Sequence, residues 1–314
     1  MVDSKQQWKA WLYLSPAIVL LLVFTVYPIF NTVRMAFLEN YSGLKAAAGQ
    51  TFEFGLGNFT KVMEYKRFLQ CLKNTVLLCV LTVPISTILA LLIAVALNSI
   101  KWLQKGLQTI FFLPYVTNSI AIGMVFAAMF NIVGAFYGTE NELIVTAGII
   151  NNVIEFFGGE AINWINAGSS YWANMTVLIV YIVWNALPFK ILILLGGLQS
   201  VNKQYYEAAQ IDSTPRWRVF LKITVPLLSP MLAYVIITGF IGGFKEYSSI
   251  IGIFGDTMGP VGDPYRLNTM VGFIYRYLPN SREGLVSAAA IILFLIIFAV
   301  TMVNLYVSKK KTHY

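Results

Sequence analysis

The chain has 314 residues, of which 58% are hydrophobic and only 11% are charged. Soluble domains usually carry about 25% charged residues, so this composition excludes an ordinary soluble protein and predicts a membrane protein. The formal net charge of +8 does not indicate nucleic-acid binding, because the basic residues form neither a continuous stripe nor a recognised nucleic-acid-binding module.

Six apolar segments are long enough to cross a hydrocarbon core of ~30 Å. They lie at about 11–34, 74–99, 107–131, 172–198, 226–253 and 285–307. We interpret the first as a retained span, because the nearest small-residue stretch that could be a signal-peptide cleavage site, at 46–48, lies too far downstream. The sequence therefore predicts an all-α membrane protein with six transmembrane helices, in which residues 1–314 form a single transmembrane domain.

The distribution of basic residues predicts the orientation of these spans. Lys and Arg are denser in segments 1–10, 100–106, 199–225 and 308–314 than in the loops on the other side, although the first of those loops is itself basic. The loop at about 132–171 contains four glutamates and neither Lys nor Arg. The positive-inside rule then places both termini in the cytoplasm.

Residue types suited to catalysis or metal binding are scarce. The only histidine is His313, and Cys71 and Cys79 lie eight residues apart in one predicted helix. At 1.5 Å per residue the two cysteines are ~12 Å apart, which is beyond disulfide reach. The chain has no Gly-rich loop ending in Gly-Lys-Ser/Thr, the usual phosphate cradle for ATP. We expect no catalytic, metal or cofactor site, and active transport would need another chain to supply the energy.

The stretch YYEAAQIDSTPRWRVFLKITVPLLSP, residues 205–230, is a polar, amphipathic block in an otherwise apolar chain. Asn202 can cap a helix over about 203–212, which should end there because Pro215 disfavours helical geometry at Thr214. Thr214 can then cap a second helix that has Pro215 at its first position. An ordinary polar loop is the simpler alternative. We predict a helix–turn–helix on the cytoplasmic membrane surface that docks into a soluble partner.

Several motifs in this chain resemble one family. Glu207-Ala208-Ala209, followed by Asp212, Ile223 and Pro226, resembles the EAA loop of ABC importer permeases. More narrowly, it is similar to binding-protein-dependent sugar permeases of the larger maltose-permease type. The resemblance covers the whole chain, because YLSPAIVLLLVFTVYPIFNTV in the first span, GLGNFTKVME, FFLPYV and the terminal VNLYVSKKK also match.

The resemblance implies the type I ABC importer permease fold, with a cytoplasmic coupling-helix loop at 199–225. The implied partners are a second homologous permease subunit, two ABC ATPase subunits and an extracellular or periplasmic sugar-binding protein. The implied location is the bacterial cytoplasmic (inner) membrane, in the lipid bilayer. The residues implied to couple to the ATPase are Tyr206, Glu207, Ala208, Ala209, Asp212 and Ser213.

Ser213 departs from the family pattern, which usually has Gly after the aspartate at this turn. Gly reaches positive φ without penalty, whereas Ser loses about 1 kcal/mol there. Either the turn differs from that of the family, or Thr214-Pro215 supplies the break.

Polar residues inside the predicted spans are candidates for a substrate pathway, because they must face a cavity or a partner. The resemblance places Asn185 and Phe189 of the fourth span, and Thr238, Gly242 and Lys245 of the fifth, at substrate-lining positions. An aromatic face with amide and hydroxyl groups suits a sugar. Packing of small residues between spans is the alternative for the glycines.

The charges in these two spans suggest a further hypothesis. In a continuous helix Thr238, Gly242, Lys245 and Ser249 share one face. Lys190 and Lys245 would suit a carboxylated or phosphorylated sugar, and Lys245 could also pair with its neighbour Glu246 near the outer end of the span.

Two other functions remain open. The first is an ABC permease for an amino acid, a peptide or another non-sugar solute. The second is a secondary transporter, which would be expected to carry membrane-centred carboxylates for ion coupling. The predicted spans hold almost none except Glu246, so the sequence disfavours this second alternative.

Overall fold

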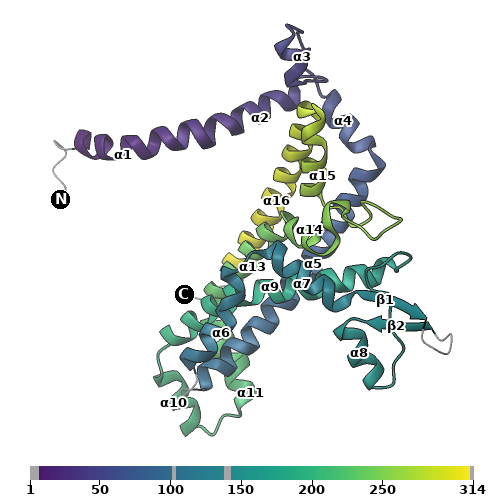
Figure 1. Ribbon diagram of the computed structural model, residues 1–314. Coiled ribbons are helices and arrows are strands. Elements are labelled where there is room, and N and C mark those ends of the chain that lie inside the picture. The colour runs from purple at the N-terminus through teal and green to yellow at the C-terminus, as the bar shows by residue number, and fades with distance from the viewer. Residues whose placement is uncertain (1–6, 101–103, 138–142, 312–314) are drawn as a thin grey trace. The chain divides into compact units, whose positions relative to one another are not determined.

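The computed structural model describes residues 7–100, 104–137 and 143–311 (Figure 1). They fall into two compact units. Unit 1 contains the described residues up to Leu69 together with Phe273–Leu295, and unit 2 contains Gln70–Gly272 and the described residues from Ile296 onward. The single transmembrane domain remains a prediction.

Long apolar helices account for the predicted spans. Four are long and apolar enough to cross a membrane by themselves: Trp8–Phe37, Lys66–Ser99, Tyr171–Ser200 and Glu283–Lys309. Two more candidates are bent pairs, Gly106–Val116 with Ser119–Phe130 at 99° and Arg216–Leu227 with Ser229–Phe244 at 69°. The described residues thus hold four spans, or up to six if each bent pair is one span, which agrees with the six predicted.

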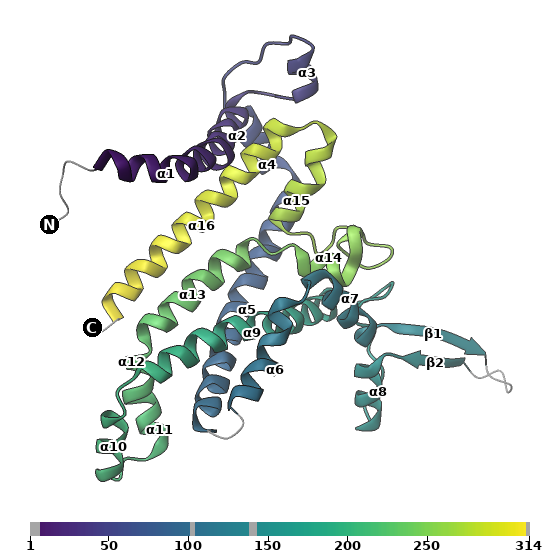
Figure 2. The ribbon, with the colours of Figure 1, turned by 60° about the vertical axis from the view of Figure 1, so that its left-hand side comes forward.

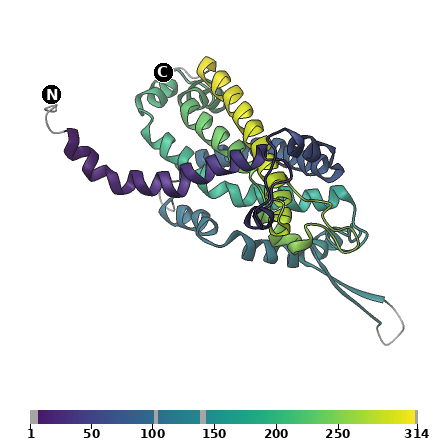
Figure 3. The ribbon, with the colours of Figure 1, turned by 90° about the horizontal axis from the view of Figure 1, so that it is seen from above.

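Unit 1 contains the first span, the short helices of the loops next to it, and the beginnings of two long helices. Its elements are α1 (Gln7–Leu21), a π-helical segment (Leu22–Val26), α2 (Tyr27–Phe37), α3 (Gly43–Ala47), α4 (Gly57–Glu64), the beginning of α5 (Lys66–Ser99), most of α15 (Met270–Tyr277), a 3-10 turn (Leu278–Asn280) and the beginning of α16 (Glu283–Lys311). Figure 3 shows α1 and α2 as one continuous curved rod. No residue in its most apolar stretch is buried, so this span offers its whole surface to lipid or to another subunit.

In unit 2, helices α6, α7, α13 and α14 pack against α9. The elements of this unit include most of α5, α6 (Gln104–Val116), α7 (Ser119–Phe130), α8 (Ile149–Phe156), α9 (Tyr171–Ser200), α10 (Gln204–Ile211), α11 (Arg216–Val219), a π-helical segment (Phe220–Thr224), α12 (Val225–Leu227), α13 (Ser229–Phe244) and α14 (Ser248–Phe254). Two apolar clusters form its core. One contains Leu78, Leu178 and Ile250, and the other contains Ala90, Leu194 and Val235.

A two-stranded hairpin lies in the loop predicted between the third and fourth spans. Strands β1 (Ile132–Tyr137) and β2 (Leu143–Ala147) pair antiparallel, with an irregularity between Ile132 and Gly134. The segment is rich in β-branched residues but too short to cross a membrane. Figures 1 and 2 show the hairpin well separated from α10 and α11 within unit 2.

Polar residues interrupt two of the predicted continuous spans. The Asn118 side chain caps α7 by accepting from the backbone N–H groups of Ile120 (2.8 Å) and Ala121 (3.3 Å), which restarts the helix after the bend. The fifth span, predicted at 226–253, instead ends at Phe244 and resumes as α14 at Ser248. The expectation of one continuous helical face from Thr238 to Ser249 is therefore wrong.

Helices α7 and α14 meet at two glycines. A Cβ atom on Gly123 would lie 2.7 Å from the Gly252 Cα, and one on Gly252 would lie 2.9 Å from the Gly123 Cα. Real Cβ atoms do not approach another backbone so closely. The two backbones can therefore touch only because both residues lack a side chain.

We expect Gly252→Ala to lower the free energy of unfolding by about 1–3 kcal/mol, because α7 and α14 must move apart. Chemical unfolding in detergent measures this change. Gly196→Ala is the control, since a Cβ there meets nothing within 4 Å, and it should raise the stability by about 0.5–1 kcal/mol. An equal loss for both variants would contradict the role of the contact.

Candidate functional site

A cavity of about 310 Å³ lies in unit 2 among α5, α6, α9 and α13. Four of the five residues predicted for the substrate pathway line it: Asn185, Phe189, Thr238 and Gly242. The fifth, Lys245, does not line the cavity. It follows the last residue of α13, and its side chain is exposed.

Aromatic rings form one side of the cavity. The Phe189 ring stacks on Tyr115 with centroids 5.9 Å apart and planes 19° apart, and both residues line the cavity. Next to Gly242 the cavity is open, since a Cβ atom there would meet nothing within 4 Å. A flat aromatic surface beside open space can accept the apolar face of a ring-shaped ligand.

Lys190 is buried at the edge of the same cavity, with 4% of its surface exposed. Its Nζ donates to the Ser86 Oγ (2.7 Å), the Thr87 Oγ1 (2.9 Å) and the Val83 carbonyl (3.2 Å), all on α5. Three acceptors match the three donors of an ammonium group. The charge therefore ties α9 to α5 and has no donor left for a ligand.

Glu246 is the acidic residue of the cavity. Its Oε1 accepts from the backbone N–H groups of Tyr247 (3.1 Å) and Ser249 (3.0 Å), so it caps the start of α14 and does not pair with Lys245. This competition for backbone donors explains the break in the fifth span. Among the described residues no hydrogen bond reaches Oε2, so this oxygen can accept one.

Residues 199–225 contain the predicted pair of helices. Each helix begins one residue later than predicted. Lys203, not Asn202, occupies the capping position of α10, and the Asn202 Oδ1 accepts from the Gln204 N–H (3.0 Å) just before that helix. Pro215 occupies the capping position of α11, and its carbonyl accepts from Arg218 (2.9 Å). Thr214 therefore does not cap this helix.

Ser213 adopts the left-handed conformation, with φ of 49°. The Thr214 N–H bonds the Ala209 carbonyl (2.9 Å), and the Ser213 N–H bonds the Gln210 carbonyl (3.0 Å). These are the two hydrogen bonds of a Schellman helix end, in which Gly usually holds the left-handed position. Ser213 thus keeps the turn geometry that a glycine would give.

Helix α10 has a buried and an exposed face. Ala209 is buried, and the Tyr206 hydroxyl lies 3.3 Å from the Thr224 Oγ1. Both residues therefore face inward, although the sequence analysis assigned them to ATPase coupling. The other four residues of that assignment, Glu207, Ala208, Asp212 and Ser213, are exposed.

Ile211 is 85% exposed on the same helix, and sequence reasoning missed it. The missed residues share a recognisable signal. Ile211 is an apolar residue on a polar surface helix, and Ser86 with Thr87 is a hydroxyl pair inside an apolar span. Within the described ranges, no cluster of three or more His, Cys, Asp or Glu residues could hold a metal ion.

A family model described as "Binding-protein-dependent transport system inner membrane component" matches residues 83–313. The chain is 31% identical over 299 residues to the lactose transport system permease protein of Rhizobium radiobacter, which covers 94% of this chain and 91% of the relative. It is 28% identical over 324 residues to the sulfoquinovosyl glycerol transport system permease protein of Agrobacterium fabrum, which covers 99% of this chain and 97% of the relative.

The chain also resembles a chain in the crystal structure of a bacterial ABC transporter involved in the import of the acidic polysaccharide alginate. The TM-score is 0.77, with 20% sequence identity and 98% of each chain covered. At this level of identity the likeness shows a shared fold.

We expect Ser86→Ala to lower the free energy of unfolding by about 1–3 kcal/mol, because it leaves a buried ammonium donor without an acceptor. In a Lys190→Met background the same change should cost close to nothing. Chemical unfolding in detergent completes this double-mutant cycle. Ser99→Ala is the control, since Ser99 also bonds a carbonyl one turn back on α5 (2.6 Å) but does not contact Lys190. Equal losses in both backgrounds would contradict the tie between α9 and α5.

Proposed function

The chain belongs to the family of binding-protein-dependent transport system inner membrane components, and on this premise we propose that it imports an oligosaccharide or a related sugar. It is a multi-pass inner-membrane permease of the ABC importer fold, as the sequence analysis expected, and it is a transport subunit and not an enzyme. Its relatives include permeases named for lactose, arabinooligosaccharides and sulfoquinovosyl glycerol.

The cavity among α5, α6, α9 and α13 is the observation that carries the proposal. It combines the stacked rings of Phe189 and Tyr115 with the Asn185 amide, the Thr238 hydroxyl and the Glu246 carboxylate. A sugar has an apolar ring face and an edge of hydroxyl groups, and these two surfaces match the two kinds of wall.

The charges of the cavity favour a neutral sugar over an acidic one. The acidic-sugar hypothesis rested on Lys190 and Lys245. The first uses its three donors on α5, and the second lies outside the cavity. The carboxylate of Glu246 would repel an anionic substrate and accept from a hydroxyl-rich one.

Energy would reach the cavity through α10. This helix follows α9, which carries Asn185 and Phe189, and leads through α11 and α12 into α13, which carries Thr238 and Gly242. The buried Ala209 and the contact between Tyr206 and Thr224 fix α10 to the segment that leads into α13. A partner that moves α10 would therefore move both walls of the cavity.

The partners follow from this arrangement. Two ABC ATPase subunits would dock on the exposed residues of α10 and on the equivalent helix of a second, homologous permease. The second permease would cover the α1–α2 span and complete the pathway. A sugar-binding protein would deliver the substrate on the outer face, and both termini would lie in the cytoplasm.

We expect Glu207→Lys and Ile211→Asp to leave the complex in the membrane but to lower uptake and sugar-stimulated ATPase activity at least about tenfold. Both changes place a charge on the docking face of α10, and a like or desolvated charge in an interface costs several kcal/mol. Uptake and ATPase assays in proteoliposomes measure the effect. Ser99→Lys, which places a charge at an exposed position on the same predicted side of the membrane but outside α10, is the control. Normal coupling in both α10 variants would contradict the docking role.

We expect Phe189→Ala to raise the KM for uptake of the cognate sugar roughly two- to tenfold, because the stacking surface is lost. Leu192→Ala, on the same helix but outside this cavity, should leave KM unchanged. A ligand screen of the partner binding protein identifies the sugar to use. An unchanged KM for Phe189→Ala would remove the cavity from the pathway.

A further inference from the structure

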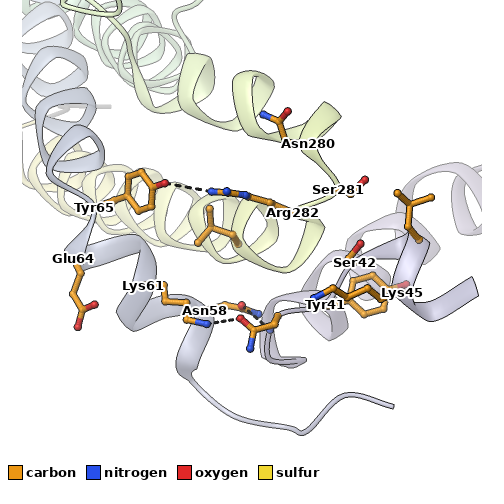
Figure 4. Close-up of a pocket in the computed structure, with 13 residues that line it drawn as sticks. Tyr41, Ser42, Lys45, Asn58, Lys61, Glu64, Tyr65, Asn280, Ser281 and Arg282 are labelled. Atoms are coloured by element: carbon orange, nitrogen blue, oxygen red, sulfur yellow. Dashed lines mark hydrogen bonds between the residues drawn. The ribbon is translucent and has the colours of Figure 1, made fainter. Parts of the chain in front are cut away.

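Unit 1 contains a second cavity, of about 670 Å³, which the sugar pathway does not use. It lies between the turn after α2, helix α4 and the start of α16, as Figure 4 shows. Lys45, Lys61 and Arg282 are among its lining residues, together with Ser42 and Ser281. Three cations and several hydroxyl groups therefore surround one space.

Buried hydrogen bonds hold the walls of this cavity in place. Asn58 is 2% exposed, and its Nδ2 donates to the carbonyls of Ala36 (3.0 Å) and Leu38 (2.7 Å), while its Oδ1 accepts from the Asn40 N–H (3.2 Å). The Gly284 N–H donates to the Tyr41 carbonyl (3.1 Å). The turn after α2 is thus tied to both α4 and α16, so the cavity is formed before any ligand arrives.

Two of the cations are oriented by neutral groups. The Lys61 Nζ donates to the Asn40 Oδ1. The Arg282 Nη1 donates to the Tyr65 hydroxyl (3.3 Å), and its guanidinium lies 5.7 Å from the centre of the Tyr277 ring. The hydrogen bond from Arg282 lowers the pKa of Tyr65.

None of these cations forms an ion pair with a carboxylate in the described part of the chain, although the Glu283 carboxylate lies next to Gly43, beside the cavity. Among the described residues the ion pair found joins Arg266 and Asp263, and neither residue lines this cavity. Glu64 is the acidic lining residue. In Figure 4 its carboxylate points away from Arg282 and Lys45. The cavity is therefore suited to an oxyanion.

The position of the cavity selects the kind of oxyanion. Three candidate spans have an end here, because one ends at Phe37 and two others begin at Lys66 and Glu283. Span ends lie at the level of the lipid headgroups. Leu44, which is 71% exposed, and Leu285 line the same cavity, so apolar surface adjoins the cations.

We propose that this cavity binds the phosphate group of an anionic phospholipid. Arg282 and Lys61 contact the phosphate oxygens, Lys45 supplies long-range attraction, and an acyl chain follows Leu44. Basic pockets between membrane helices bind lipid headgroups by this combination of charge and position. The lipid would link the first, second and last spans where they leave the bilayer.

Native mass spectrometry of the delipidated full chain, titrated with phosphatidylglycerol and with phosphatidylcholine, tests the proposal. We expect one tight phosphatidylglycerol molecule and weaker phosphatidylcholine binding. Lys61→Gln with Arg282→Gln should weaken phosphatidylglycerol binding roughly 25-fold, or about fivefold for each cation. Lys66→Gln with Lys73→Gln is the matched control, because it removes two exposed charges outside the cavity, and it should change the affinity little.

Other results would overturn the proposal. An equal loss of phosphatidylglycerol affinity in the Lys66→Gln, Lys73→Gln control would show that only the general surface charge attracts the lipid. Equally tight binding of soluble glycerol phosphate would show a site for a soluble anion. Weaker docking of the binding protein with unchanged lipid affinity would show a protein interface. If the double variant does not fold, Lys45→Gln alters only an exposed side chain. It should weaken phosphatidylglycerol binding about fivefold, and unchanged affinity would count against the site.

Discussion

The hydrogen bonds of Lys190 are the constraint on which the functional part of unit 2 depends. In a bilayer no water satisfies a buried polar group, so the protein must supply every partner. Ser86, Thr87 and the Val83 carbonyl supply them for this ammonium. Helix α9 can therefore occupy only one rotation and height against α5. That placement turns Asn185 and Phe189, which precede Lys190 on α9, toward the cavity.

The same lysine also sets the distance of a third helix. A Cβ atom on Gly239 of α13 would lie 3.1 Å from Val83 Cγ1 and 3.2 Å from the Lys190 Nζ. Only a glycine allows α13 to come so close without a shift of its neighbours. Three helices therefore surround one buried charge. Two of them, α9 and α13, are walls of the cavity and are connected through α10, and the third, α5, holds them in place. The proposed substrate cavity and the proposed coupling helix α10 thus belong to one continuous stretch of the chain, from α9 to α13.

In unit 1 a buried side-chain amide, and not a charged group, supplies the hydrogen bonds that buried polar groups need. Asn58 satisfies the orphan carbonyls at the end of α2 and holds the following turn. Among the described residues, the cations that line the nearby cavity take part in no ion pair. The two units therefore use their basic residues differently. In unit 2 the ammonium group of Lys190 uses all its donors on groups of the protein. In unit 1 the cations that line the cavity can bind an anion.

The sequence by itself determined the features that depend on local pattern. Length and apolarity located the spans, and the residue types around Pro215 located the two helices of the coupling loop. The Glu207-Ala208-Ala209 pattern identified the family. Only the tertiary structure decided which side chains face a cavity. It left Lys245 outside the cavity, although Glu246 lines it, and it turned Ala209 inward. It also bound Lys190 to hydroxyl groups more than 100 positions away along the chain. An apolar pattern indicates which segments are buried, but it does not show how each helix is rotated about its axis. Contacts between segments that are distant in the sequence exist only after the helices have packed.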